Sequence, residues 1–189
     1  MSLILGILDS GGAAAGAGGS YESIATVTVG SGGAANVEFT SIPATYTHLQ
    51  IRAIARTDRA ATGDWLEIQF NSDTASNYSD HYLAGNGSSA SAGAQTSTSY
   101  MEVNRFPAAS STASIFGAFV TDILDYANIN KNKTIRNLGG NDQNGSGEIH
   151  LGSGNWRSTN AITSIKILPG GGTNLVQYSQ FALYGIKGA

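Results

Sequence analysis

An alternation of apolar and polar side chains over residues 48–56 constrains the fold of this chain more than any other feature. Apolar side chains take every second position, and Ile54 is the one exception on the polar side. Because successive side chains of a strand point to opposite faces, a period of two predicts a half-buried β-strand. Residues 65–70 alternate in the same way. With the C-terminal segment, these strands place eight side chains in the expected core: Leu49, Ile51, Ala53, Leu66, Ile68, Phe70, Phe181 and Leu183.

Short β-branched or alternating segments recur from residue 24 onwards, with Gly, Asn, Ser or Pro between them. They predict about eleven strands, at 24–29, 36–40, 48–56, 65–70, 80–84, 100–106, 114–124, 134–138, 147–152, 161–168 and 177–186. There is no convincing amphipathic helix, although residues 123–130 could form one helical turn. Many short strands without βαβ units predict an all-β fold, an antiparallel, jelly-roll-like β-sandwich over residues 21–189.

Residues 1–20 differ from the rest and predict an extended N-terminal arm. An apolar head is followed by a run of only Gly and Ala from residue 11 to residue 19. Such a run forms no core of its own, and the head is too short to bury its own side chains. We therefore expect the arm to fill a groove of a neighbouring subunit through five side chains: Leu3, Ile4, Leu5, Ile7 and Leu8.

The composition argues against several classes of protein. Charged residues are 12% of the chain, against a usual ~25%, and the 10 Lys and Arg residues form no basic stripe for nucleic acid. The lack of cysteine excludes disulfides, zinc–thiolate sites and a cysteine nucleophile. No segment reaches the ~20 apolar residues of a membrane span, and no basic residue precedes the apolar head as in a secretory signal. We expect a protein that assembles in the cytoplasm and packs against other proteins.

Candidate catalytic residues form no complete site. Asp9-Ser10-Gly11 matches the core motif of aspartic proteases, but that chemistry needs two such carboxylates, and only a homodimer could supply the second. We interpret the motif as a turn. The histidines accompany no nucleophile elbow and no metal-ligand spacing, so we expect surface or hydrogen-bonded side chains at His48, His81 and His150. The sequence predicts no enzyme, no catalytic residue and no cofactor.

Two loops match binding motifs only in part. Asp142, Asn144 and Ser146 alternate as oxygen donors as in a calcium loop, but Ser153 stands where a bidentate glutamate is needed. The Asn-Gly dipeptide within this stretch is a strong hairpin signal, so we predict a tight turn and leave a weak calcium site open. Residues 168–174 are glycine-rich without the lysine of a P-loop, and we predict a long hairpin loop there.

Aromatic side chains keep a sugar-binding alternative open. In a β-sandwich such side chains lie mostly in the core or at an interface, but they can also stack on sugars in a lectin-like site. The candidates are Trp65, Tyr78, Tyr82, Tyr100 and Trp156.

Four segments carry a resemblance to known proteins: LGILDS (5–10), YESIA (21–25), FTSIPATYTHLQIR (39–52) and FALYGIKG (181–188). Through them the chain resembles, nearly end to end, a family of small structural proteins of tailed-phage particles. The resemblance implies a jelly-roll-like sandwich on the virion and supplies no active-site residues.

The main hypothesis is a capsid decoration, or cement, protein that binds the shell of the major capsid protein as a homo-oligomer, expected to be a trimer. The alternative is a tail protein: a fibre, a receptor-binding module or an adaptor. A hydrolase acting on host polysaccharide is a third class. Paired acids in a groove would favour the hydrolase, clustered exposed aromatics the tail protein, and a broad, low-charge contact surface the decoration protein.

Overall fold

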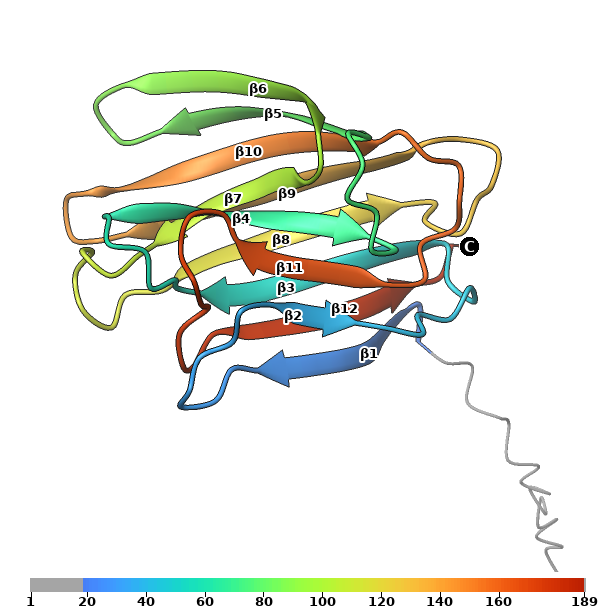
Figure 1. Ribbon diagram of the computed structural model, residues 1–189, viewed down its shortest axis with the longest axis horizontal. Coiled ribbons are helices and arrows are strands. Elements are labelled where there is room, and N and C mark those ends of the chain that lie inside the picture. The colour runs from blue at the N-terminus through green and yellow to red at the C-terminus, as the bar shows by residue number, and fades with distance from the viewer. Residues whose placement is uncertain (1–18, 189) are drawn as a thin grey trace, which may run out of the picture.

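The computed structural model describes residues 19–188, which form two antiparallel β-sheets packed face to face (Figure 1). The large sheet has eight strands, in the order β1 (Tyr21–Thr28), β12 (Gln180–Ile186), β3 (His48–Ala55), β8 (Gly117–Leu124), β9 (Lys133–Asp142), β10 (Gly147–Trp156), β5 (Tyr78–Gly85) and β6 (Ala90–Thr98). The small sheet has four, in the order β2 (Val37–Phe39), β11 (Ile165–Pro169), β4 (Gly63–Phe70) and β7 (Met101–Pro107). The predicted all-β antiparallel sandwich is confirmed.

The core lies between the sheets and contains every side chain that the alternation placed there. All eight are buried: Leu49, Ile51, Ala53, Leu66, Ile68, Phe70, Phe181 and Leu183. The register explains this, because Ile51 of β3 lies opposite Leu183 of β12, with both side chains directed at the small sheet. Ile54, the apolar exception in the pattern, lies on the outer face and is 46% exposed. Ile54 therefore points to solvent because of its position in the alternating strand, although its side chain is hydrophobic.

Two local expectations differ from the structure. Residues 125–130 form turns, with the Asn128 amide donating to the Asp125 carbonyl at 3.0 Å, and no helix is found within residues 19–188. The glycine-rich segment after β11 is not a hairpin loop, because β11 belongs to the small sheet and β12 to the large one. The chain crosses between the layers at this point.

The sequence does not predict β6, which brings the described strands to twelve. Its residues are Ala, Ser, Gly, Gln and Thr, and none of them is buried. β6 is the edge strand of the large sheet and pairs with β5 alone. An edge strand without a buried face carries no hydrophobic alternation, so its sequence resembles a loop.

Two hairpins extend the large sheet beyond β8. These are β9–β10 and β5–β6, and without them the two sheets would have four strands each, β1-β12-β3-β8 facing β2-β11-β4-β7. The β5–β6 hairpin lies at the top of Figure 1, beyond β7, the edge strand of the small sheet. One layer of the sandwich is therefore wider than the other.

The core assignment predicts a contrast between buried and exposed leucines. Leu66→Ala and Ile68→Ala should each lower the free energy of unfolding by about 2–5 kcal/mol, because they remove fully buried methyl groups and leave a cavity. The matched control is Leu138→Ala on β9, whose side chain is exposed and should cost no more than ~0.5 kcal/mol. Urea denaturation measures all three. Equal losses at buried and exposed positions would mean that the assigned faces are wrong.

Candidate functional site

Large aliphatic side chains are exposed on the outer face of the large sheet. Leu83, Leu151 and Leu138 lie directly opposite one another on β5, β10 and β9. Ile149 lies two residues from Leu151, between Gly85 and Gly140 on the neighbouring strands, so no flanking side chain covers it. The exposed fractions are 54% for Leu83, 52% for Leu138, 59% for Ile149 and 55% for Leu151. We call these four side chains the apolar face.

Small side chains line the hollow over the apolar face, and charged side chains begin beside it, at Arg136 two residues from Leu138. A shallow hollow of about 250 Å³ is lined by the four residues together with Ala84, Gly85 and Ala90. The charged side chains of the same sheet surface lie further along the strands, where Arg136 Nε donates to Asp122 Oδ2 at 2.9 Å. A contiguous exposed apolar patch with a polar surround is typical of a protein–protein interaction site.

A second feature lies where the small sheet ends, between β7 and the β5–β6 hairpin. A hollow of about 250 Å³ is lined there by Arg59, Trp65, Tyr82, Ser91, Arg105, Glu148 and His150. A neighbouring hollow of about 600 Å³ shares Arg105 and Glu148 with it and continues between the loops 86–88, 110–112 and 141–147. We call the two together the polar groove. Its residues come from six strands (β4, β5, β6, β7, β9 and β10) and four loops that are far apart in the sequence.

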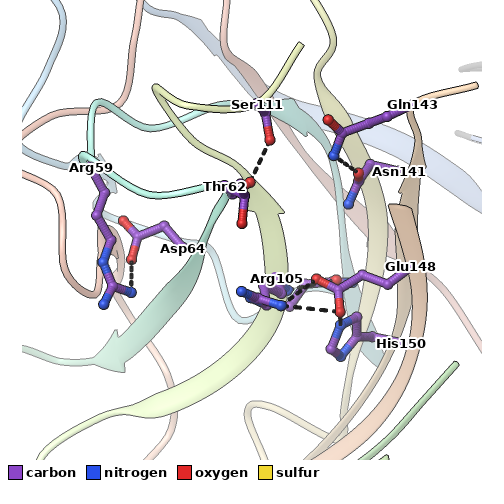
Figure 2. A network of polar contacts seen from close by, with 10 residues as sticks. Arg59, Thr62, Asp64, Arg105, Ser111, Asn141, Gln143, Glu148 and His150 are labelled. Carbon is purple, nitrogen blue, oxygen red and sulfur yellow. Dashed lines mark hydrogen bonds and ion pairs between the residues drawn. The ribbon is translucent and has the colours of Figure 1, made fainter. Parts of the chain in front are cut away.

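Ion pairs organise the floor of the polar groove. Arg105 Nη1 donates to both Glu148 oxygens at 3.0 and 3.3 Å, and His150 Nε2 lies 3.1 Å from Glu148 Oε2. Figure 2 shows the guanidinium of Arg105 and the ring of His150 both directed at this carboxylate. The contact with His150 and the positive charge of Arg105 hold the pKa of Glu148 below its ordinary value, against the effect of burial. Glu148 is therefore an anion with its charge already compensated.

Arg59 and Asp64 form a second pair at the edge of the groove. Arg59 Nη1 donates to Asp64 Oδ1 at 3.3 Å, and the fully buried Asp64 carboxylate also accepts the amides of Gly171 and Gly172, both at 2.9 Å. The glycine-rich loop that resembled a phosphate site thus uses its amides on a carboxylate of its own chain. The amides of Gly171 and Gly172 are therefore not free to bind a phosphate.

A buried arginine holds the loop 110–112, which forms one wall of the larger hollow. Arg56 follows β3, and its guanidinium donates to the carbonyl oxygens of Thr112, Ser111 and Ile115 at 2.7, 2.9 and 2.9 Å. The five N–H donors of one planar guanidinium can hold several carbonyls of an irregular segment at once. The wall of the groove is therefore a fixed surface.

The aromatic candidates divide between core and groove. Tyr78 and Trp156 are fully buried and cannot stack on a sugar. Trp65 and Tyr82 are half-buried and line the polar groove together, with ring centroids 5.1 Å apart. Tyr100 does not line it. The structure brings together two of the five predicted side chains.

Two of the three histidines match the prediction of surface or hydrogen-bonded side chains. His81 is exposed, and His48 Nδ1 accepts the Asp125 amide at 2.9 Å, as expected. His150 differs from the expectation, because it is only 2% exposed and neither ring nitrogen makes a hydrogen bond of good geometry to the described residues.

The predicted tight turn at the calcium-like loop is confirmed. The Gln143 amide donates to the Ser146 carbonyl at 2.7 Å, and the central Asn144 and Gly145 have φ values of 56° and 103°. Asp142 uses its side chain on the Asn144 amide, at 2.8 Å. Within residues 19–188 no cluster of three or more His, Cys, Asp or Glu side chains could hold a metal ion.

An acid pair that the sequence did not suggest lies between β4 and β7. Glu67 and Glu102 are direct cross-strand partners, and Glu67 is buried. Burial, with the charges of Glu102 and Asp64, raises the pKa of Glu67 to about 7. Neither glutamate lines the polar groove. The paired acids therefore do not form the acid-lined groove that would favour a hydrolase.

The arm residues Leu3, Ile4, Leu5, Ile7 and Leu8 and the motif Asp9-Ser10-Gly11 lie outside the described residues. In the part of the chain that the structure describes, no helix is long and apolar enough to cross a membrane. No protein-family model, curated protein or solved structure matches this chain.

The raised pKa of Glu67 predicts a pH-dependent stability. Between pH 4.5 and about 7 the unfolded chain releases a proton that folded Glu67 retains, so stability is lost as the pH rises through this window. Glu67→Gln removes this cost and should stabilise the protein at pH 8 more than at pH 4.5, by on the order of 3 kcal/mol at most.

Chemical denaturation at the two pH values, compared with the wild type, measures this difference. The control is Glu38→Gln on β2, whose side chain is exposed. A stabilisation by Glu67→Gln that is equal at both pH values would show that Glu67 has an ordinary pKa.

Proposed function

We propose that this chain is a non-enzymatic structural protein of a tailed-phage particle, a capsid decoration protein that binds and stabilises the shell of the major capsid protein. The observation that carries the proposal is the apolar face, because four large aliphatic side chains stand together and more than half exposed on one flat surface. The resemblance to virion proteins supplies the kind of partner. A face of this type suits a protein that spends its functional life bound to another protein.

The energetics agree with a contact that is weak per copy and strong per particle. Burying the exposed parts of four aliphatic side chains contributes about 3–6 kcal/mol before the entropy cost of association. No charge has to be desolvated on the apolar face itself, which keeps the opposing cost low. Many copies on one shell multiply a modest affinity through avidity.

The proposal extends to assembly and fold. We infer a homo-oligomer, a trimer, in which the arm of one subunit contacts a neighbour, and a virion location after assembly in the host cytoplasm. We also infer a jelly roll from the strand orders β1-β12-β3-β8 and β2-β11-β4-β7, with β5–β6 and β9–β10 as inserted hairpins. Partners are virion proteins, and neither nucleic acid, membrane nor cofactor is part of the proposed function.

A tail protein that recognises a receptor is the second candidate. The observation that favours it is the polar groove, in which Trp65 and Tyr82 remain half-exposed beside charged side chains. A decoration protein needs no such groove for binding to the shell.

The first test introduces charge into the apolar face. Leu138→Asp combined with Leu151→Asp should reduce binding to particles that lack the protein by about tenfold or more, because two carboxylates would be desolvated at the contact. The fold should persist, since both side chains are exposed. Co-sedimentation measures occupancy, and Thr134→Asp, also exposed on β9, is the matched control. Wild-type occupancy of the double variant would exclude this face as the contact.

The second test removes the arm. A chain that begins at Ser20 retains every described strand and should stay folded by circular dichroism, yet lose its place on the particle. Burial of five Leu and Ile side chains contributes on the order of 5–10 kcal/mol before the cost of ordering the arm. A full-length control in which the five aliphatic residues of the head are changed to Ser tests the head separately from the Gly/Ala run. The five residues are Leu3, Ile4, Leu5, Ile7 and Leu8. Truncated protein at wild-type occupancy would refute an assembly role for the arm.

A further inference from the structure

We propose that the polar groove is a saccharide-binding site for an acidic oligosaccharide, in which Trp65 and Tyr82 stack on sugar rings and Arg59 and Arg105 donate to acidic groups. The aromatic end of this site lies on the inner side of the large sheet, opposite to the apolar face. At the loop end, a hollow of about 660 Å³ adjoins both, since Leu138, Ile149 and Glu148 line it together. A single chain can therefore bind a protein shell on one side and a glycan on the other.

The aromatic rings of the groove differ from those of the core. Trp156 and Tyr78 are fully enclosed, with ring centroids 6.3 Å apart. Trp65 instead meets Tyr82 at 5.1 Å and the ring of His150 at 5.2 Å and 82°, and both Trp65 and Tyr82 keep part of their surface open to the hollow. Sites for small ligands combine such apolar aromatic walls with a few directed polar groups.

Two glycines make room for the side chains that shape the groove. Gly93 lies opposite Tyr82 in the β5–β6 pair, and a Cβ there would lie 2.5 Å from the tyrosine ring. A Cβ at Gly63 would lie 2.8 Å from Arg105 Nε. Any larger residue at either position would displace a wall of the groove, so the positions of Tyr82 and Arg105 depend on these glycines.

The polar lining fits a ligand with many hydroxyl groups. Hydroxyl and amide side chains that can both donate and accept line the two hollows, among them Thr62, Ser88, Ser91, Ser110, Asn86 and Asn141. The ring of His150 also lines the smaller hollow, but its nitrogens are buried, so it contributes ring surface beside Trp65 and no hydrogen bond to a ligand. Hydroxyl-rich recognition of this kind matches a sugar better than a peptide.

The charges indicate an acidic sugar. The carboxylate of Asp64 is fully buried and that of Glu148 is mostly buried, and both already accept several hydrogen bonds. The arginine side chains are the exposed members of the pairs, at 45% for Arg59 and 38% for Arg105. A ligand therefore meets guanidinium donors, which favour carboxylate, sulfate or phosphate groups.

The dimensions indicate more than one sugar ring. Ligand clefts commonly measure roughly 300–1,000 Å³, and the two connected hollows measure about 250 and 600 Å³. Because they meet at Arg105 and Glu148, a chain of sugars could cross the Arg105–Glu148 pair from the aromatic end to the loop end. This arrangement places the acidic group of the ligand near the middle of the groove.

A printed array of neutral and acidic microbial polysaccharides, probed with the full-length protein, tests the proposal. We expect binding to acidic glycans, with a change in tryptophan fluorescence in solution that is lost in Trp65→Phe. Arg105→Ala and Trp65→Ala should each weaken binding by about tenfold or more. Ser91→Trp fills the smaller hollow from an exposed position without removing any contact, and it should weaken glycan binding to a similar extent. This variant replaces Trp65→Ala as the test if Trp65→Ala fails to fold.

Two controls separate the groove from the rest of the surface. Tyr178→Ala removes an aromatic side chain that is 70% exposed outside the groove and should leave glycan binding unchanged. The variant with Leu138→Asp and Leu151→Asp should also bind glycans normally. Loss of particle binding and loss of glycan binding can therefore be told apart. The proposal would be overturned if no glycan bound on the array, or if glycan binding survived Ser91→Trp. A single-stranded oligothymidylate serves as a second acidic probe, and binding to it alone, without any glycan, would also overturn the proposal.

Discussion

A four-stranded sheet cannot cover an eight-stranded one, and the rest of this molecule depends on that mismatch. With strands about 4.8 Å apart, the small sheet is roughly 14 Å wide and the large sheet roughly 34 Å. The burial of Leu49, Leu66 and Phe181 fixes the small sheet over one part of the large sheet. The β5–β6 hairpin is left beyond the edge of β7 (Figure 1). Its inner side is open to a groove because no second layer covers it.

The two hairpins that widen the large sheet carry most of both candidate sites. β5, β9 and β10 hold the whole apolar face, and β5, β6 and β10 hold Tyr82, Ser91, Glu148 and His150 of the polar groove. The framework of four strands on four holds the predicted core, and the hairpins add Tyr78, Ile135 and Trp156 to it. The same hairpin strands thus direct some side chains into the core and others into the candidate sites.

The sequence predicted those parts of the fold that depend on a period of two. In β3 and β4 the alternation alone identified the buried face, because one side of each strand packs on the opposite sheet. β6 escaped prediction because neither of its faces is buried. The burial of Lys133 was also not predicted, because a charged side chain normally indicates a surface position. Its Nζ is buried and donates to the carbonyls of Asn128, Lys131 and Thr159 at 2.7, 3.0 and 3.0 Å.

The candidate sites were less accessible from sequence than the fold. Trp65 and Tyr82 were recognised as possible sugar platforms, but nothing in the local pattern separated them from the buried Tyr78 and Trp156. The ion pair of Arg105 and Glu148 joins strands 43 residues apart. The apolar face depends on the register of β5, β9 and β10, which no single segment encodes. Both sites arise from long-range pairing, and local periodicity carries no information about it.

We propose, as the central point, that the outer face of β5, β9 and β10 is buried against another protein in a phage particle. An electron cryomicroscopy map of a particle with this chain located in it tests the claim most directly. We expect Leu83, Leu138, Ile149 and Leu151 to contact a neighbouring chain, with the polar groove open to solvent. A map in which these four side chains face solvent while the chain is held elsewhere, or a particle that lacks the chain, would contradict the claim.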